Sequence, residues 1–155
     1  MISLRTMKAE EFPNYRDYFI VDYANEIATN FGYTLAKSRA IALEELMNDL
    51  PQTISTPDHF LLCIETSGED TIGYLWYKLL DKGETVFILD FVLFDNFRGL
   101  GYGKATLIAL GEKLLQSGVE QIKLRVAFDN TRAFRLYEKL GFKITGYNMV
   151  KILEE

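Results

Sequence analysis

The first third of the chain places apolar residues three or four positions apart, which is the period of a helix that buries one face. This pattern predicts a helix, or two short ones, from Glu10 to about Asn30, with the apolar face Phe12, Tyr15, Phe19, Tyr23, Ile27 and Phe31. Gly32 interrupts the pattern, and Thr34 is a suitable N-cap for a second helix over Leu35–Leu50. Residues 2–6 alternate weakly and predict a short first strand.

The middle of the chain is typical of strands joined by tight turns. Apolar stretches cover His59–Thr66, Thr71–Leu80 and Thr85–Phe94, and the segments between them, residues 67–70 and 81–84, contain Gly, Asp and Glu. Gly and Asp suit the backbone conformations of turns. Three consecutive strands with short connections predict an antiparallel meander.

The last third returns to helices and strands in alternation. Leucines at helical spacing predict a helix over Lys104–Ser117, and strict alternation predicts a strand over Ile122–Phe128. Asp129 or Asn130 can cap a further helix over Thr131–Leu140, and Phe142–Leu153 is expected to form two final strands. Because strand, helix and strand follow one another from residue 85 to 128, we expect a right-handed parallel crossover. The fold class is therefore α/β or α+β, with one central mixed sheet.

The length, charge and composition of the chain exclude several domain organisations and classes of partner. The chain has 155 residues, which predicts a single domain over 1–155. Its net charge of −5 argues against nucleic acid and favours cationic small molecules or basic peptides as partners. No apolar run reaches the roughly 18 residues of a membrane span, so no membrane partner is expected. The lone Cys63 predicts neither a disulfide nor a metal site, and as a buried small hydrophobe it suits a cytoplasmic protein. His59 is expected to be structural or at the surface.

A glycine-rich loop lies between the third strand of the meander and the following helix. Glycines at alternate positions permit positive φ and close ligand approach, and a helix N-terminus attracts anions. Two basic side chains flank them, which predicts a phosphate or pyrophosphate site. The dinucleotide pattern G-x-G-x-x-G and the P-loop pattern both fail here. The residues assigned to this site are Arg98, Gly99, Leu100, Gly101, Tyr102, Gly103 and Lys104.

Two stretches of the chain resemble one known family. The loop Arg-Gly-x-Gly-x-Gly is similar to the acetyl-CoA pyrophosphate loop, [QR]-x-x-G-x-[GA], of the GNAT acetyltransferases. Residues 130–142 resemble the second GNAT signature, N-x-x-A-x-x-L-Y-x-K-x-G-F, at every fixed position. The two stretches occur in the family's order, one strand–helix unit apart. The resemblance covers essentially the whole chain and implies a central mixed, mainly antiparallel sheet of about six to seven strands flanked by helices.

The resemblance also implies an activity, which is direct acetyl transfer from acetyl-CoA, as co-substrate and without a metal, to a primary amine of a small molecule or peptide. Main-chain groups of Phe91, Val92 and Leu93 would bind pantetheine, as would Asn130, which is also a helix cap. The Tyr137 hydroxyl would be the general acid for the departing thiolate. The alternative is a binding module that senses acyl-CoA without turnover. Dimers are common in the family, so a homodimer is compatible with the sequence.

The sequence allows more than one identity for the general base. Asp90 is a carboxylate in an apolar strand, which fits either a catalytic base or a structural acid bonded to nearby backbone or to Arg125. A water relay would also serve. Arg125 stands where family members that acetylate protein N-termini carry a glutamate, which argues against that substrate. The acids Asp17, Asp22 and Glu26 lie on the first helix, where they either face solvent beside the core or border an amine pocket.

Overall fold

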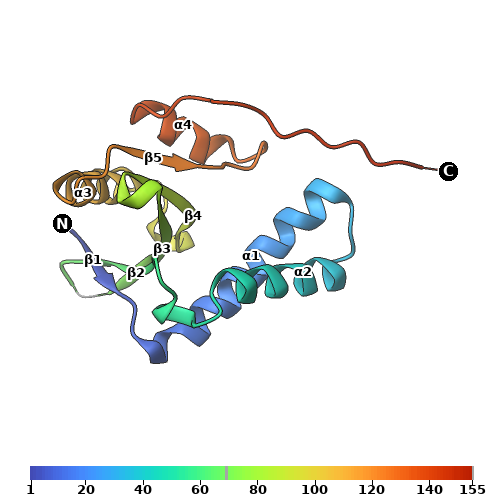
Figure 1. Ribbon diagram of the computed structural model, residues 1–155, viewed down its shortest axis with the longest axis horizontal. Helices are drawn as coiled ribbons and strands as arrows, with labels where there is room; N and C mark the ends of the chain where they lie inside the picture. The colour runs from blue at the N-terminus through green and yellow to red at the C-terminus, as the bar shows by residue number, and fades with distance from the viewer. Residues whose placement is uncertain (69, 155) are drawn as a thin grey trace.

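The computed structural model describes residues 1–68 and 70–154, so the predicted turn at 67–70 lies partly outside the described residues. Five strands form one sheet in the order β1-β2-β3-β4-β5. They are β1 (Ile2–Thr6), β2 (His59–Thr66), β3 (Thr71–Leu80), β4 (Thr85–Leu93) and β5 (Gln121–Leu124). Neighbours are antiparallel except β4 and β5, which are parallel (Figure 1). The prediction of a mixed, mainly antiparallel sheet is confirmed.

Four helices surround the sheet: α1 (Phe12–Phe31), α2 (Leu35–Asp49), α3 (Tyr102–Gln116) and α4 (Thr131–Lys139). Short 3-10 turns occur at Ala9–Glu11, Thr53–Ser55, Asp81–Gly83 and Asp95–Phe97. The predicted cap of α2 is present, because Thr34 Oγ1 accepts a hydrogen bond of 3.1 Å from the Lys37 N–H. Gly32, at φ +69°, ends α1 in the left-handed conformation that glycine adopts without strain.

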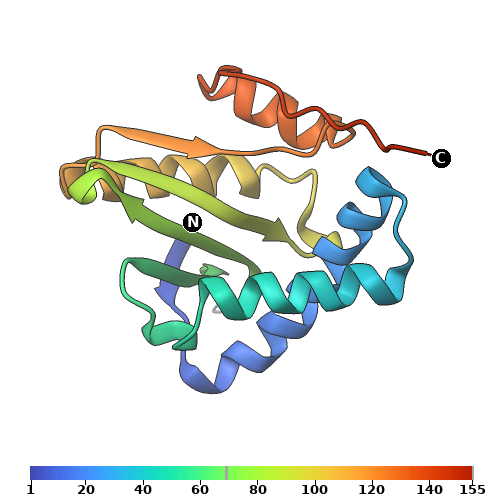
Figure 2. The ribbon, with the colours of Figure 1, turned by 45° about the vertical axis from the view of Figure 1, so that its right-hand side comes forward.

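The sheet separates two apolar cores. Successive side chains of a strand point to opposite faces. Leu62 and Ile64 of β2 accordingly pack with α3, whereas Leu61 and Cys63 pack with α1 and α2. Figure 2 shows α1 and α2 crossing in front of the strands and α3 behind them. The expected apolar face of α1 is largely confirmed, since Phe12, Tyr15, Phe19 and Ile27 are buried, Tyr23 is half-buried and Phe31 is exposed.

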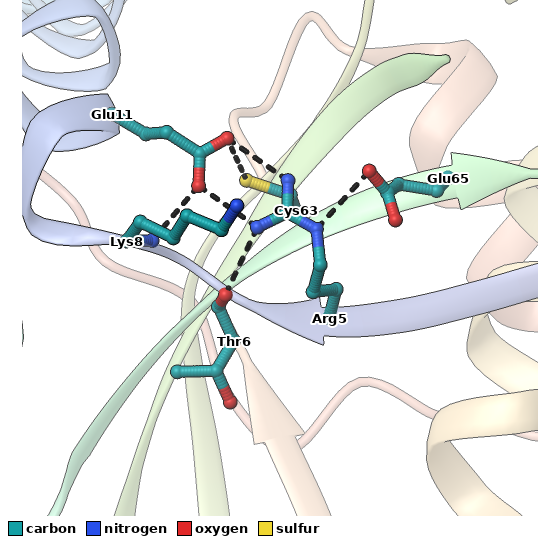
Figure 3. Close-up of polar contacts among 6 residues, drawn as sticks. All are labelled: Arg5, Thr6, Lys8, Glu11, Cys63 and Glu65. Carbon is teal, nitrogen blue, oxygen red and sulfur yellow. Dashed lines mark hydrogen bonds and ion pairs between the residues drawn. The ribbon is translucent and has the colours of Figure 1, made fainter. Parts of the chain in front are cut away.

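A polar network fixes β1 to the start of the helices (Figure 3). Arg5 donates two hydrogen bonds, of 2.8 and 2.9 Å, to the carboxylate of Glu11 and forms a 3.1 Å ion pair with Glu65. Hydrogen bonding to Arg5 lowers the pKa of Glu11 to about 2. Cys63 is buried as predicted, and burial raises the pKa of its thiol to about 11. A thiol that stays protonated at neutral pH is a poor nucleophile.

His59 has a structural role, as expected. Its Nδ1 accepts a hydrogen bond of 3.0 Å from Trp76 Nε1, which joins β2 to β3 on the face covered by α1. The ring is partly exposed, and burial lowers its pKa from the ordinary value. The neutral imidazole that this hydrogen bond needs is therefore favoured.

Two predictions at the C-terminal end are wrong. The fifth strand ends at Leu124 rather than Phe128, because β5 pairs only with Thr85–Ile88 of β4 and the two strands separate beyond that point. Phe142–Leu153 forms no strand; it is extended and lies outside the sheet, so the described residues give five strands instead of six to seven. Within the described ranges, no helix combines the length and apolar character needed to cross a membrane.

Candidate active site

A bulge and a gap distinguish the second half of β4. Trp76 of β3 pairs with Asp90 while Tyr77 pairs with Ile88, so Leu89 is an extra residue on β4. The ladder with β5 ends at Ile88 and Leu124. Among the described residues, Phe91, Val92 and Leu93 therefore pair only with β3, and the β4 edge that faces β5 is open there. Bulges of this kind bend a strand and re-aim its side chains, often beside active sites.

The bulge turns Asp90 toward α1. Ile88 and Phe91 contact the core under α3, and Leu89 contacts the core under α1. Asp90 also reaches the α1 side, where the Tyr15 hydroxyl donates a hydrogen bond of 2.7 Å to its carboxylate. Burial raises the pKa of Asp90 to about 7, and the negative charges of Asp22 and Glu26 act in the same direction. The hydrogen bonds from Tyr15 and from the Phe91 N–H lower this pKa, but by less. A carboxyl group that titrates near neutral pH can exchange protons under physiological conditions.

Acidic residues of α1 stand near Asp90. Asp22 and Glu26 act on its charge, and burial raises the pKa of Asp22 as well. Arg125 forms an ion pair of 2.6 Å with Glu26. The alternative that Arg125 binds Asp90 is therefore wrong, since its guanidinium is bound to a different carboxylate. Asp17 pairs with the adjacent Arg16 at 3.2 Å and is exposed.

The predicted glycine loop connects β4 to α3. Gly99 and Gly101 have φ of +76° and +88°, conformations that other residues adopt only with strain. Gly101 immediately precedes α3, and a Cβ added there would meet nothing within 4 Å, so the space above the helix N-terminus is open. Leu100 is 66% exposed, and the Tyr102 ring packs against Phe97. Gly103 and Lys104 follow in the first turn, where Gly103 lies close to Leu136 of α4.

The basic side chains around the loop differ from the prediction, because the predicted Arg98 is bound within the loop and another arginine lies over it. Arg98 donates a hydrogen bond of 2.9 Å from Nε to the Leu93 carbonyl and pairs with Asp95 at 3.1 Å, so its guanidinium braces the loop. Arg132, which the sequence analysis did not single out, lies over the loop: a Cβ placed on Gly99 would be 2.6 Å from its Nη2. The signal was present in the sequence as a cation two residues after Asn130, but only the fold brings α4 to the loop.

The start and the end of α4 carry the two remaining predicted residues. Asn130 Oδ1 accepts a hydrogen bond of 3.2 Å from the Ala133 N–H, which confirms its role as helix cap. Tyr137 packs against the core under α3 and contacts the Phe142 ring edge-on at 5.5 Å between centroids. Burial, with a contribution from the charge of Asp90, raises the pKa of Tyr137 to about 12. The phenol is thus protonated at neutral pH and within electrostatic reach of Asp90.

These features fit a nucleotide with a diphosphate and a peptide-like arm. The open strand edge has main-chain amides, the N-terminus of α3 has a favourable dipole, and Arg132 is a cation beside Gly99, which are the kinds of group that such a ligand requires. Among residues 1–68 and 70–154, no three His, Cys, Asp or Glu side chains come together as a metal site would require.

Comparison with known proteins agrees with this geometry. The family model described as Acetyltransferase (GNAT) family matches residues 20–142. The chain is 33% identical to the uncharacterized N-acetyltransferase YycN of Bacillus subtilis over 98% of this chain and 99% of that protein. The protein belongs to the GNAT acetyltransferase family. As a GNAT protein it is an N-acetyltransferase, an enzyme of the acyltransferase class.

Solved GNAT structures share its architecture. The crystal structure of YycN superposes with a TM-score of 0.93 at 31% identity and covers 100% of both chains. The PaiA N-acetyltransferase of Thermoplasma acidophilum, solved in complex with coenzyme A, superposes with a TM-score of 0.71 at 19% identity, over 96% of this chain and 93% of that one. The second likeness shows the fold alone. YdgE of Bacillus subtilis is a further N-acetyltransferase relative, 28% identical over 97% of this chain and 98% of its own.

Proposed function

We propose that this GNAT enzyme transfers the acetyl group of acetyl-CoA directly to a primary amine of a small molecule or peptide. The observation that carries the proposal is the combination of an open β4 edge with the half-buried Asp90 carboxyl group, which the Tyr15 hydroxyl holds beside it at 2.7 Å. Coenzyme A in the PaiA complex supports the choice of co-substrate. Acetyl-CoA supplies an activated acyl thioester.

The loop and the strand edge would hold this co-substrate. The edge of β4 at Phe91–Leu93, which has no strand beside it, would offer main-chain groups to the pantetheine as a sheet edge does to an added strand. The α3 N-terminus with Gly99–Lys104 receives the diphosphate, and Lys104 and Arg132 provide cations. Arg98 keeps the loop in shape through the Leu93 carbonyl. Asn130, which caps α4, would also contact the pantetheine.

Asp90 and Tyr137 divide the proton transfers between them. An amine with a pKa of about 10.4 is mostly protonated at neutral pH, so a base must remove its proton before nitrogen attacks the thioester carbon. Asp90 takes this proton from the ammonium group, and the free amine then forms the C–N bond. Tyr137 gives its proton to the sulfur as the C–S bond breaks, and its phenolate takes up the second proton that the nitrogen loses as the amide forms. Burial raises the pKa of Asp90 to about 7 and that of Tyr137 to about 12, so near neutral pH the carboxylate can accept a proton and the phenol holds one to donate.

The acceptor would approach from the α1 side of Asp90. Asp22 of α1 places negative charge near Asp90, and Glu26 beside it is paired with Arg125, so Asp22 is the acid that would attract a cationic amine. The Tyr74 ring lies 5.0 Å from that of Tyr15, and the Tyr18 ring is edge-on to Tyr74 at 6.2 Å between centroids, so these rings add an aromatic wall. A charged amine attached to an apolar or extended body fits these surroundings.

A thiol-release assay with a panel of amines tests the activity. Tyr137→Phe is expected to lower turnover by about 10²-fold, a typical acid–base contribution, while leaving the affinity for acetyl-CoA nearly unchanged. Tyr147→Phe is the matched control, because Tyr147 is 80% exposed and outside the site. Unchanged turnover in Tyr137→Phe would refute its role. Tight acetyl-CoA binding without turnover on any amine would identify the protein as an acyl-CoA sensor instead.

The assignment of Arg132 has its own test. Arg132→Ala should raise the dissociation constant of coenzyme A by about 10-fold, the effect of losing one charge-assisted hydrogen bond. Arg135→Ala is the control, because it removes the same charge from an exposed position on the same helix. Equal affinities of the two variants would show that Arg132 does not contact the co-substrate.

A further inference from the structure

An ion pair joins the first helix to the far side of the open β4 edge. Arg125, the first residue after β5, forms a 2.6 Å ion pair with Glu26 of α1, which lies 99 positions away in the sequence. Figures 1 and 2 both show the later turns of α1 beside the segment that follows β5. The charge of Arg125 also acts on Tyr23, nearly one turn before Glu26. Arg125 is thus seated on α1 at the point where β4 and β5 have separated.

Glu26 lies on the same face of α1 as the residue that contacts Asp90. Tyr15, Asp22 and Glu26 follow one another at intervals of seven and four residues, which places them within about 40° of one another around a helix of 3.6 residues per turn. The Tyr15 hydroxyl donates to Asp90 at 2.7 Å, so this face of α1 follows the proposed approach of the acceptor. Residues four apart on a helix are neighbours, so Asp22 and Glu26 would together suit an acceptor with two ammonium groups.

One of these two carboxylates is already occupied. Asp22 is exposed, and Arg98, whose charge acts on it, is bound to Asp95 at 3.1 Å. Glu26, in contrast, is neutralised by the guanidinium of Arg125. Arg125 therefore holds the position beside Glu26 that a second ammonium group of an acceptor would need.

We propose that Arg125 is a specificity-determining residue that restricts the acceptor to an amine with a single positive charge. The proposal rests on the function proposed above, because it concerns the acceptor of the same site. A monoamine would hold its ammonium group near Asp22 and Asp90 before Asp90 takes the proton. A second ammonium group would meet the charge of Arg125 and would have to displace it from Glu26. Placing a like charge in the path of a competing ligand is a general means of rejecting it.

The remaining surroundings suit an apolar body on this amine. Tyr18 of α1, Tyr74 of β3 and Phe94 after β4 are half-buried. The Phe94 ring lies 5.7 Å from that of Tyr18 and 5.3 Å from that of Tyr74 between centroids, so the three rings form one continuous surface. The charges of Asp22 and Asp90 act on Tyr18, which puts this surface beside the acids. The acceptor class is therefore a monoamine with an apolar or aromatic body, as opposed to a diamine or polyamine.

Two acceptors of equal length test the proposal. Hexylamine and hexamethylenediamine differ in the second ammonium group, and thiol release from acetyl-CoA gives kcat/KM for each. The intact protein should prefer hexylamine. Arg125→Gln should raise the ratio of diamine to monoamine kcat/KM by about 5-fold, the effect of one partly exposed charge pair. Arg39→Gln is the matched control, because it removes the same charge from an exposed position on α2 and should leave the ratio unchanged.

A double variant, Glu26→Gln with Arg125→Gln, identifies the carboxylate involved. It lacks the acid that would bind the second ammonium group, so its ratio should return to that of the intact protein. An ion pair that only fastens α1 to the segment after β5 predicts instead that Arg125→Gln changes kcat/KM for both amines by the same factor, and this result would overturn the proposal. An intact protein that prefers the diamine, or a double variant that keeps the raised ratio, would also overturn it.

Calorimetry of the coenzyme A complex separates this proposal from the proposed activity. Titration with each amine gives two dissociation constants, and Arg125→Gln should shift their ratio toward the diamine by about 5-fold. An intact protein that releases no thiol with any amine would refute the activity, while the binding ratio would still test Arg125. Equal ratios in the intact protein and in Arg125→Gln would overturn the role of Arg125 even where hexylamine is acetylated. Failure of both amines to bind would overturn both proposals.

Discussion

The hydrogen bond between Tyr15 and Asp90 gives the sharpest prediction about the proposed base. It joins residues 75 positions apart and lowers a pKa that burial raises to about 7. A hydrogen bond to a charged group contributes about 1.5–3 kcal/mol. Since one pKa unit corresponds to about 1.4 kcal/mol, Tyr15→Phe should raise the pKa of Asp90 by about 1–2 units. The acid limb of the pH–rate profile should move to higher pH by the same amount.

Carbon-13 NMR titration of the aspartate carboxyl groups measures this shift without any acceptor amine. The Asp90 resonance is assigned by its loss in Asp90→Asn. Tyr74→Phe is the matched control, because the Tyr74 ring lies 5.0 Å from that of Tyr15 but its hydroxyl does not bond to Asp90. An unchanged or lowered Asp90 pKa in Tyr15→Phe, or an equal shift in the control, would refute the reasoning.

Three further predictions concern stability. Because folding raises the pKa of Asp90, the protonated carboxyl group stabilises the folded protein at low pH, and this stabilisation is lost as the pH rises through about 7. Asp90→Asn should therefore raise the free energy of unfolding by about 2–4 kcal/mol at pH 8 but not at pH 4, as measured by urea unfolding. Arg5 lowers the pKa of Glu11, so the Glu11 carboxylate stabilises the folded protein at neutral pH, and the free energy of unfolding should fall from pH 5 to pH 2. Glu11→Gln should lower the free energy of unfolding by about 1–2 kcal/mol at pH 7 and remove this pH dependence. In Gly73→Ala the added methyl group would overlap the Val92 carbonyl oxygen. Thermal unfolding should show that the free energy of unfolding falls by about 2–4 kcal/mol, together with loss of coenzyme A binding. A normal melting temperature would contradict this contact.

Local pattern was enough to predict most of the elements. The bounds of β2 and β3 agree with the expected strands at both ends, because turn residues follow each alternating stretch directly. The caps at Thr34 and Asn130 are also as predicted, since an N-cap depends only on residues two or three positions away. The parallel crossover is present because a helix of this length between two strands permits few other arrangements.

The local sequence pattern could not predict the features that depend on contacts between distant parts of the chain. The bulge at Leu89 arises from the register between β3 and β4, and it alone turns Asp90 toward Tyr15. The position of Arg132 over Gly99 likewise depends on how α4 packs against the loop. At the C-terminus, the prediction of two strands over Phe142–Leu153 was wrong, because strand formation also needs a partner edge and no residue of this segment specifies one.

Calorimetric titration with coenzyme A tests the central claim most directly. Gly101→Val fills the open space at the α3 N-terminus and strains a backbone at φ +88°, so it should abolish binding. Gly32→Val imposes a comparable strain, at φ +69°, in the α1–α2 connection, outside the loop assigned to the diphosphate, and should leave the affinity unchanged. Saturable heat with the intact protein and Gly32→Val, and none with Gly101→Val, is the predicted result. Equal heats from all three proteins, or no heat from the intact protein, would contradict the assignment of this loop to the coenzyme A diphosphate.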